Sequence, residues 1–394
     1  MFRSTTFGQI VKLLDRGMFR RVVKSHGSDK YSKGFRTWDH LMACLFSQLS
    51  GSKSLRDLEV SFNANRAMHY HAGSREIKRS TLCDANQTRD SHVFGAIARE
   101  LLSTENKELQ AVLHTLENAK LSVLDSTAIR IMGRGSEWTE ETKTRQYQGL
   151  KLHVQFSPEE ERFEHFNVTA SNVNDVTAAL DFPLVSGHIY TYDKGYCDYN
   201  WWNKIQEADS YFITRVKNNA AYEVLEDRAI PVADQSYVLS DQTITLKNKH
   251  PRGGKRNELA GKSLRLVRVK NPEDGREYTL ISNLLIERAS YIGRYYKQRW
   301  SIELLFKWLK QNLKLTRFLG QNENAIRIQI YTAIIAYILL HRFKKLCTHH
   351  FDRMIDLMAW IRTALAFNLK LTDPPRKRND PSHGEAQLCL NFGW

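Results

Sequence analysis

The chain has 394 residues, with 58 Lys and Arg against 43 Asp and Glu, so its formal net charge is +15 and its sequence pI is about 9.5. The length corresponds to two or three domains, and 42% hydrophobic residues with 11% aromatics supply enough apolar side chains for real cores. This composition excludes a disordered protein, and the basic excess points to a polyanionic partner, nucleic acid first and anionic membrane second.

The apolar segments are too short for membrane insertion or export. The longest apolar stretch, residues 330–340, falls well short of the ~20 residues that span a bilayer. Lys12 divides the N-terminal apolar segment, so a signal peptide is not indicated and we expect a cytoplasmic protein. The cysteines are odd in number, scattered and never in a CxxC pair, so neither a disulfide framework nor a zinc site is indicated.

Hydrophobic periodicity divides the chain into five segments. The pattern in residues 1–118 predicts short basic helices joined by tight turns. A DNA-binding domain and an ordinary helical domain with solvated Lys and Arg both fit this pattern about equally well. Residues 119–222 change to apolar strand-like runs with modest helices between them, as in an α/β core. Residues 223–286 are polar, β-rich and look inserted, residues 287–345 are strongly helical, and residues 346–394 form a helical region with a flexible tail.

Two aspartates follow apolar strand-like runs in the second segment. Asp125 closes the run LSVLD, and Asp193 closes the run HIYTYD. A carboxylate at the carboxyl edge of a strand is held at the rim of a sheet, where ligands of open α/β folds bind. The alternative is that each aspartate only begins a turn, a position that Asp favours.

A basic helix is predicted over residues 291–314. At the helical rotation of ~100° per residue, one face of this helix carries a single acid, Glu303, among Tyr296, Arg299, Lys307, Lys310 and Lys314. The apolar flank consists of Ile302, Leu305, Phe306, Leu309 and Leu313. An i, i+4 ion-pair ladder is the structural alternative, but four cations around one carboxylate favour an external anion such as phosphate.

Two strand-end aspartates and a helix glutamate form a hard, all-oxygen ligand set. Such a set favours Mg²⁺ or Mn²⁺ over zinc. A pair of these ions can activate a water or sugar hydroxyl on one side of a phosphodiester and stabilise the departing oxygen on the other. The residues therefore predict metal-dependent chemistry on a phosphodiester.

The spacing Tyr296-x2-Arg299-x3-Glu303-x6-Lys310 resembles the YREK signature of bacterial insertion-sequence transposases of the IS-four type. The surrounding sequence agrees: Asp125-Ser-Thr and Asp193-Lys-Gly-Tyr end strands, and a strand FITRVK and a long β-rich segment precede the glutamate. The resemblance covers residues 119–340, and residues 1–118 look like the helical domain that precedes the catalytic core in this group.

The resemblance implies a fold and a set of site residues. The fold is α/β, with an RNase H-like mixed sheet flanked by helices, interrupted by a β-rich insertion, with an N-terminal helical domain and a helical C-terminal part. Asp125, Asp193 and Glu303 become the DDE catalytic triad and the ligands of a two-metal Mg²⁺ site in which Mn²⁺ can substitute. The implied DNA contacts are Tyr296, Arg299 and Lys310 near the cleaved end, and Arg215 and Lys217 at the end of FITRVK.

The resemblance also implies the reaction. A homodimer in a synaptic complex would bind the terminal inverted repeats as double-stranded DNA, cut them, and transfer the freed 3′-hydroxyl into target DNA in the bacterial cell. In the family's hairpin step a flipped base stacks on a tryptophan of the β-insertion; here no Trp lies between Trp202 and Trp300, so Tyr278 or another ring would substitute. An RNase H-like nuclease without strand transfer and a non-catalytic DNA-binding derivative are the alternatives.

Overall fold

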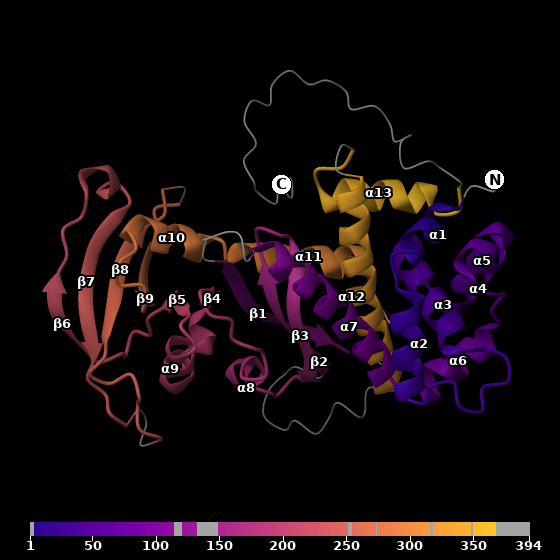
Figure 1. Cartoon of the computed structure of the whole chain (residues 1–394), viewed down its shortest axis with the longest axis horizontal. Coiled ribbons are helices and arrows are strands. Elements are labelled where there is room, and N and C mark those ends of the chain that lie inside the picture. Colours follow the sequence, from indigo (N-terminus) through magenta and orange to yellow (C-terminus); the bar gives the residue numbers. More distant parts are fainter. Residues whose placement is uncertain are drawn as a thin grey trace. The chain divides into compact units, whose positions relative to one another are not determined.

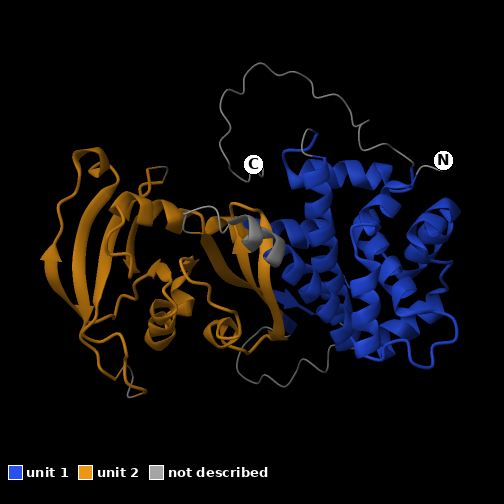
Figure 2. Cartoon of the chain, viewed as in Figure 1, with its two compact units in different colours: residues 1–113, 128–150, 304–394 blue, residues 114–127, 151–303 orange. Residues whose placement is uncertain are grey.

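The computed structural model describes residues 4–113, 120–131, 149–250, 254–272, 274–315, 318–347 and 350–367 (Figure 1). The chain forms two compact units, residues 1–113, 128–150 and 304–394 in unit 1, and residues 114–127 and 151–303 in unit 2 (Figure 2). The predicted tail beyond residue 367 lies outside the described residues.

Unit 1 begins with a series of helices, as the sequence predicts. They are α1 (Thr6–Val11), α2 (Arg16–Ser25), α3 (Thr37–Ser50), α4 (Leu55–Asn63), α5 (Arg66–Ala72), α6 (Arg79–Thr88) and α7 (His92–Leu113). Local signals set their ends: Gly51 terminates α3 at a φ of +80°, and the Ser54 hydroxyl accepts a hydrogen bond from the Asp57 amide to cap α4.

Two later helices, α12 (Glu323–Leu346) and α13 (Met354–Ala364), belong to the same unit. The structure buries α12 among helices α1, α3, α6, α7 and α13. The Asn324 amide fixes its start by donating to the carbonyls of Asn86 at 3.0 Å and Arg89 at 2.7 Å. In the described part of the chain α12 alone is long and apolar enough to cross a membrane, but 89% of its apolar window is buried in the protein.

One nine-stranded sheet runs through the α/β region (Figure 1). Its strands are β1 (Leu121–Arg130), β2 (Gly149–Ser157), β3 (Arg162–Ala170), β4 (Ile189–Tyr192), β5 (Tyr211–Arg215), β6 (Tyr222–Asp227), β7 (Val238–Leu246), β8 (Ser263–Lys270) and β9 (Glu277–Ser282). Their order is β3-β2-β1-β4-β5-β9-β8-β7-β6, with β1, β4 and β5 parallel. This mixed sheet with flanking helices confirms the predicted fold class.

The β-rich segment extends the sheet and does not form a separate layer. β9 pairs antiparallel with β5, and β8, β7 and β6 follow as successive antiparallel neighbours. Of these strands the sequence pattern indicated β7, β8 and β9 but not β6, because every residue of β6 is exposed and no polar-apolar alternation marks it. The segment is therefore continuous with the catalytic sheet through β5.

The side chains of β4 and β5 alternate between two cores, as expected for strands covered on both faces. On one face Tyr190 and Phe212 belong to the core that holds Trp202 of helix α9 (Tyr199–Glu207). On the other face Ile189 and Ile213 belong to the core that holds residues of helix α10 (Ala289–Lys297). A short helix α8 (Asp175–Ala179) and two 3₁₀ turns, Lys194–Tyr196 and Val232–Asp234, complete unit 2.

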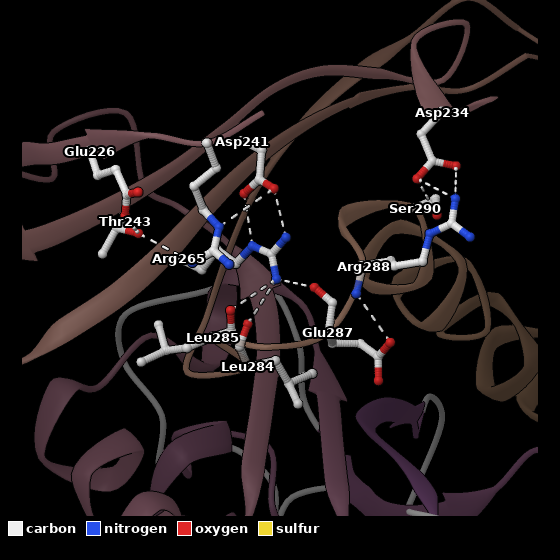
Figure 3. A network of polar contacts seen from close by, with 11 residues as sticks. Glu226, Asp234, Asp241, Thr243, Arg265, Leu284, Leu285, Glu287, Arg288 and Ser290 are labelled. Atoms are coloured by element: carbon white, nitrogen blue, oxygen red, sulfur yellow. Dashed lines mark hydrogen bonds and ion pairs between the residues drawn. The ribbon is translucent and has the colours of Figure 1, made fainter. Parts of the chain in front are cut away.

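A buried ion pair links the β7–β8 hairpin to the start of α10 (Figure 3). The Arg265 guanidinium donates to Asp241 at 2.8 and 2.6 Å, and each side chain is 4% exposed. Its remaining nitrogen donates to the main-chain carbonyls of residues 284, 285 and 287. Arg288 and Ser290 in turn donate to Asp234 at 3.1 and 3.0 Å. The strand-rich segment therefore fixes where α10 begins.

His40 on α3 is a fully buried titratable group in unit 1. Its Nε2 lies 2.8 Å from the Asn86 side-chain oxygen and donates to it, while Nδ1 has no partner among the described residues. Burial lowers the pKa of His40 to about 3, with a smaller contribution from the charge of Arg89. The imidazole is therefore neutral in the folded protein over the ordinary pH range.

We predict that His40 makes the folded protein acid-sensitive. The pKa of His40 in the folded protein, about 3, lies below the ordinary value of 6.5. Its contribution to the free energy of unfolding is therefore complete above pH 6.5 and is lost as the pH falls. Between pH 7 and pH 5 the loss from this one group should reach about 2 kcal/mol, measured as a shift of the urea midpoint. His40→Gln should flatten that acid dependence, whereas the exposed His26→Gln should leave it intact; an unchanged slope in His40→Gln would contradict the assignment.

Candidate active site

The register of two parallel strands places Asp125 beside Asp193. Leu124 of β1 is paired with Tyr192 of β4, and the next residue on each strand is an aspartate. The sequence predicted that Asp125 ends its strand, but β1 continues to Arg130. The pairing of β1 with β4 does end at Leu124. Asp193 caps the following 3₁₀ turn by accepting a hydrogen bond from the Gly195 amide at 2.7 Å.

The glutamate comes from a helix that is shorter than the sequence pattern indicates. We expected one helix over residues 291–314, but α10 ends at Lys297 and α11 (Trp300–Asn312) begins after a turn at residues 298–299. Arg299 therefore lies at a junction, and Glu303 lies in the first turn of α11. The apolar flank is as predicted, since Ile302, Leu305, Phe306, Leu309 and Leu313 are all buried.

Arg299 lies between two of the three carboxylates. Its Nη1 atom is 2.6 Å from Glu303 Oε1 and 3.9 Å from Asp125 Oδ2. The arginine side chain is 11% exposed, against 22% for Asp125 and 37% for Glu303. Burial alone would lower the pKa of Arg299, but Tyr296, Glu303 and Asp125 together raise it above its ordinary value. The guanidinium is thus a fixed cation inside the acidic cluster.

Asp125 is the carboxylate whose ionisation costs most in this arrangement. Burial raises its pKa to about 7, and the negative charges of Asp193 and Glu303 raise it further against the opposing effects of the Ser126 amide and Arg299. The Ser126 amide donates to Asp125 Oδ1 at 2.7 Å. A half-buried acid near two others needs positive charge, and one guanidinium does not balance three carboxylates.

The donor set suits a divalent metal ion by its chemistry but not by its present spacing. Asp125, Asp193 and Glu303 offer hard oxygen ligands of the kind that Mg²⁺ and Mn²⁺ prefer. Within the described residues, however, no three His, Cys, Asp or Glu side chains are gathered closely enough to hold a metal ion. Arg299 supplies the positive charge beside Asp125 and Glu303 in this structure.

A row of two aromatic rings between two guanidinium groups runs from the acidic cluster to β5 and β9. The Arg299 guanidinium carbon lies 5.9 Å from the ring centre of Tyr296, which lies 6.1 Å from that of Tyr278, and the Arg215 guanidinium carbon lies 6.0 Å beyond. Burial raises the pKa of the Tyr296 phenol. Three donors in this row are buried without a hydrogen-bond partner outside it among the described residues: Tyr296 Oη, Arg299 Nε and Arg215 Nε.

A cavity of about 320 Å³ opens beside this row. Its wall includes Lys194, Arg215, Lys217, Tyr222 and Tyr278, with Glu277 as its acid. Arg215 and Lys217, both predicted from the sequence, therefore line one concave site, and Lys194 directly follows Asp193 in the chain.

The other predicted basic residues follow Glu303 along the chain. Lys307 is exposed on α11, and Lys310 is half-buried, which lowers its pKa, as does the neighbouring charge of Arg130. Lys314 lies beyond the end of α11 with a φ of +50°, so its predicted place on the helix face is wrong. Its Nζ is buried without a partner among the described residues, and burial lowers its pKa to about 8.

The sequence pattern did not single out Asp175, which supports the end of the β1–β4 pairing. One Asp175 oxygen accepts from the Ser126 hydroxyl at 2.7 Å and the Lys151 ammonium at 3.2 Å, and lies 3.5 Å from His153 Nδ1. Ser126 directly follows Asp125, so this cluster holds the backbone that carries the catalytic candidate. A single Asp at a helix start looks like a cap, and only the fold brings its partners from β1 and β2.

Comparison with known proteins identifies the family. A family model described as a transposase DDE domain matches residues 118–339, and one described as a domain of unknown function (DUF4372) matches residues 2–75. A Sinorhizobium fredii protein named as transposase y4zB is 37% identical over 265 residues, which cover 66% of this chain and 69% of the relative. A Synechocystis protein named as the transposase of insertion element IS4SA is 28% identical over 325 residues, covering 79% and 86%.

Among solved structures, a chain of the piggyBac transposase synaptic complex with hairpin DNA aligns over 96% of this chain and 86% of its own length. Its TM-score is 0.45, with 13% sequence identity.

The chain belongs to the DDE transposases, because the family model matches more than half of it and the 37% identical relative is covered over more than two thirds of its length. It is a DNA transposase similar to those of bacterial insertion sequences, an enzyme that cleaves and rejoins phosphodiester bonds. Enzymes of this family generally use a divalent metal ion.

Proposed function

We propose that this transposase cuts the ends of its insertion sequence in a Mg²⁺-dependent reaction at Asp125, Asp193 and Glu303, and that Mn²⁺ can replace Mg²⁺. The observation that carries the proposal is the β1–β4 register, which sets the two aspartates side by side at the point where the strands separate. The Arg299 contacts with Glu303 and Asp125 bring the third carboxylate to the same place.

Each group has a distinct task in the proposed reaction. When bound, the metal ions supply an activated water or 3′-hydroxyl and stabilise the departing oxygen. The three carboxylates would hold those ions, and the Ser126 amide and the Asp175 cluster keep Asp125 in place. Tyr296 and Arg299, whose buried donors lack acceptors among the described residues, would donate to the phosphate of the cleaved end. Lys310 and Lys307 would bind the DNA backbone further along, whereas the predicted contact of Lys314 would first require its buried Nζ to become exposed.

The freed 3′-hydroxyl then attacks target DNA in the same site, so the reaction is cut-and-paste transposition. Two transposon ends must be held together for this, and we propose a homodimer bound to paired terminal inverted repeats in the bacterial cytoplasm. The five segments predicted from the sequence would divide the work, with residues 1–118 binding DNA and residues 119–222 and 287–345 forming the catalytic core around the β-rich segment 223–286.

The triad assignment predicts three inactive variants. Asp125→Ala, Asp193→Ala and Glu303→Ala should each lower Mg²⁺-dependent cleavage of a duplex from the element's end by about 10²–10³-fold or more, because each removes charge that the transition state requires. Binding of the same duplex, measured by electrophoretic mobility shift, should persist. Asp227→Asn, at an exposed acid on β6, is the control and should cleave normally.

The assays also separate the alternative functions. Normal cleavage in any of the three triad variants would contradict the assignment. Cleavage by the unmodified protein without strand joining under any condition would identify a nuclease, and end binding without cleavage would identify a non-catalytic derivative.

We further propose that the cavity at Arg215, Lys217 and Tyr278 receives a nucleotide of the cleaved strand. Its volume of about 320 Å³ suits one nucleotide, its cations suit the phosphate, and Tyr278 offers a ring for stacking in the segment where the family's tryptophan is missing. The cavity lies next to Asp193 through Lys194, which brings that nucleotide near the proposed cleavage site.

Substitution of Tyr278 tests the stacking role. Tyr278→Ala should weaken binding of a pre-cleaved end duplex by about 1–3 kcal/mol, because an aromatic ring contributes roughly that much per stacked base. Tyr278→Phe keeps the ring and should bind normally, as measured by fluorescence anisotropy. A base analogue such as 2-aminopurine near the cleaved end should change its fluorescence on binding to the unmodified protein but less so with Tyr278→Ala. Equal losses in the Ala and Phe variants would argue against stacking.

The helix α2 is the proposed DNA contact of the N-terminal domain. Arg16, Arg20 and Lys24 follow one another at i, i+4 spacing and are exposed, while Met18, Phe19 and Val23 bury the opposite face. The Arg16 guanidinium stacks on Trp38 at 3.5 Å and donates to the Ala72 carbonyl, but Arg20 and Lys24 form no ion pair with a described residue. Like charges at this spacing repel, so a phosphate backbone would relieve the repulsion.

A pair of neutral substitutions tests the α2 contact. Arg20→Gln with Lys24→Gln should reduce the slope of log K against log salt for end DNA by about 2, since each phosphate contact contributes roughly 0.9. The control, Arg66→Gln with Arg353→Gln, removes the same charge from side chains already paired with Glu76 and Asp356 and should change the slope less. Equal effects in both double variants would show that only net charge matters.

A further inference from the structure

The position of Arg299 raises a question that the proposed cleavage reaction leaves open. Its Nη1 atom lies 2.6 Å from Glu303 and 3.9 Å from Asp125, two of the three proposed metal ligands. The side chain is 89% buried and sits at the turn between α10 and α11, so solvent does not screen its charge well. A divalent cation at the same carboxylates would meet this guanidinium at short range.

The arrangement of the carboxylates agrees with that conflict. Among the described residues no three acidic or metal-binding side chains are grouped for a metal ion, although Asp125 feels the charges of both Asp193 and Glu303. The guanidinium contributes one positive charge where three negative charges converge. It therefore partly neutralises the cluster and occupies one Glu303 oxygen.

Two buried donors show where the guanidinium could go. Arg299 Nε and Tyr296 Oη are buried next to each other, and neither has a third group as a hydrogen-bond partner among the described residues. A buried donor without an acceptor is costly, and a phosphate oxygen would satisfy both groups. Arg299 thus has two possible anionic partners, the carboxylates that it contacts here and a phosphate.

We propose that Arg299 is an internal competitor of the divalent metal ion, which holds Glu303 and Asp125 in the DNA-free protein and releases them when a DNA phosphate binds its guanidinium. This inference rests on the proposed triad. Because coupling between two ligands is reciprocal, DNA would strengthen metal binding and the metal would strengthen DNA binding by the same factor. The device would keep the enzyme poorly loaded with metal, and so inactive on random DNA, until an end is seated.

Metal binding without DNA gives the direct test. We would titrate the full-length protein with Mn²⁺ and follow free Mn²⁺ by electron paramagnetic resonance. Arg299→Gln should bind Mn²⁺ about fivefold or more tightly than the unmodified protein, the lower end of ordinary coupling factors. The control is Arg294→Gln, which removes the same charge from an exposed position on α10 and should bind Mn²⁺ as the unmodified protein does.

A second arm measures the coupling. A pre-cleaved end duplex should tighten Mn²⁺ binding to the unmodified protein and should do so much less for Arg299→Gln. Unchanged or weaker Mn²⁺ binding in DNA-free Arg299→Gln would overturn the proposal, because Arg299 would then only orient Glu303. If Arg299→Gln does not fold, judged by circular dichroism, Arg299→Lys replaces it. The lysine side chain is shorter and would reach the two carboxylates less well, so intermediate Mn²⁺ affinity is expected and unchanged affinity would contradict the proposal.

A third arm separates failure of this inference from failure of the triad. Glu303→Gln introduced into Arg299→Gln should abolish the gained Mn²⁺ affinity. If the gain persists without the Glu303 carboxylate, the metal binds elsewhere and the triad assignment fails. If the gain is lost but DNA has no effect on Mn²⁺ binding to the unmodified protein, the triad stands and the release by phosphate is wrong.

Discussion

Burial of the Asp125 carboxyl is the constraint on which the proposed site depends. It raises the pKa of Asp125 to about 7, and the charges of Asp193 and Glu303 raise that pKa further. Two unit charges 4 Å apart at an effective dielectric constant of 20 interact with about 4 kcal/mol, so neighbouring acids add to a cost that the scaffold must offset. The protein accepts an unfavourable site, which is typical of positions that serve binding or catalysis and not stability.

The scaffold imposes this convergence from two directions. Parallel pairing of β1 with β4 fixes the positions of the aspartates to within about one residue, because a one-residue slip of either strand would turn its own aspartate to the other face of the sheet. The glutamate depends on where α10 begins, and that point is held by Arg265 through the carbonyls of residues 284–287 and by Asp234 through Arg288 and Ser290. The β-rich segment thus positions the third acid although it contributes none of the three.

Residues of the proposed site could be predicted from the sequence where a local pattern marks them, and not where their position depends on the fold. Asp125, Asp193 and Glu303 could be proposed because strand ends and helix periodicity are local patterns. The buried flank of α11 agrees with that periodicity, while β1 continues past Asp125. The turn at residues 298–299 could not be found, since no Gly or Pro interrupts the helical pattern there. Lys314 was misplaced on the helix face for the same reason: its positive φ is unusual for lysine.

Long-range pairing was the other part that the sequence could not supply. Residues 223–286 look like an independent β insertion because nothing local says that β9 will pair with β5, whose paired residues lie 65–69 positions earlier in the chain. Asp175 likewise resembles a helix cap until the fold brings Ser126 and Lys151 to its carboxylate. Both are contacts between segments far apart in the chain, and neither leaves a local periodic signal.

The net charge of +15 takes on a different meaning once partners are assigned to individual cations. Arg265, Arg342 and Arg353 contribute to the positive total, yet each is matched by an acid of this chain, Asp241, Glu105 and Asp356 respectively. Arg20 and Lys24 on α2 have no such match among the described residues, and the Arg215 side chain faces a cavity. The Arg299 guanidinium belongs to neither group, because it lies beside Glu303 and Asp125, two of the proposed metal ligands. If it also binds a DNA phosphate, as proposed, affinity for DNA and affinity for metal would depend on the same guanidinium, which the total charge does not reveal.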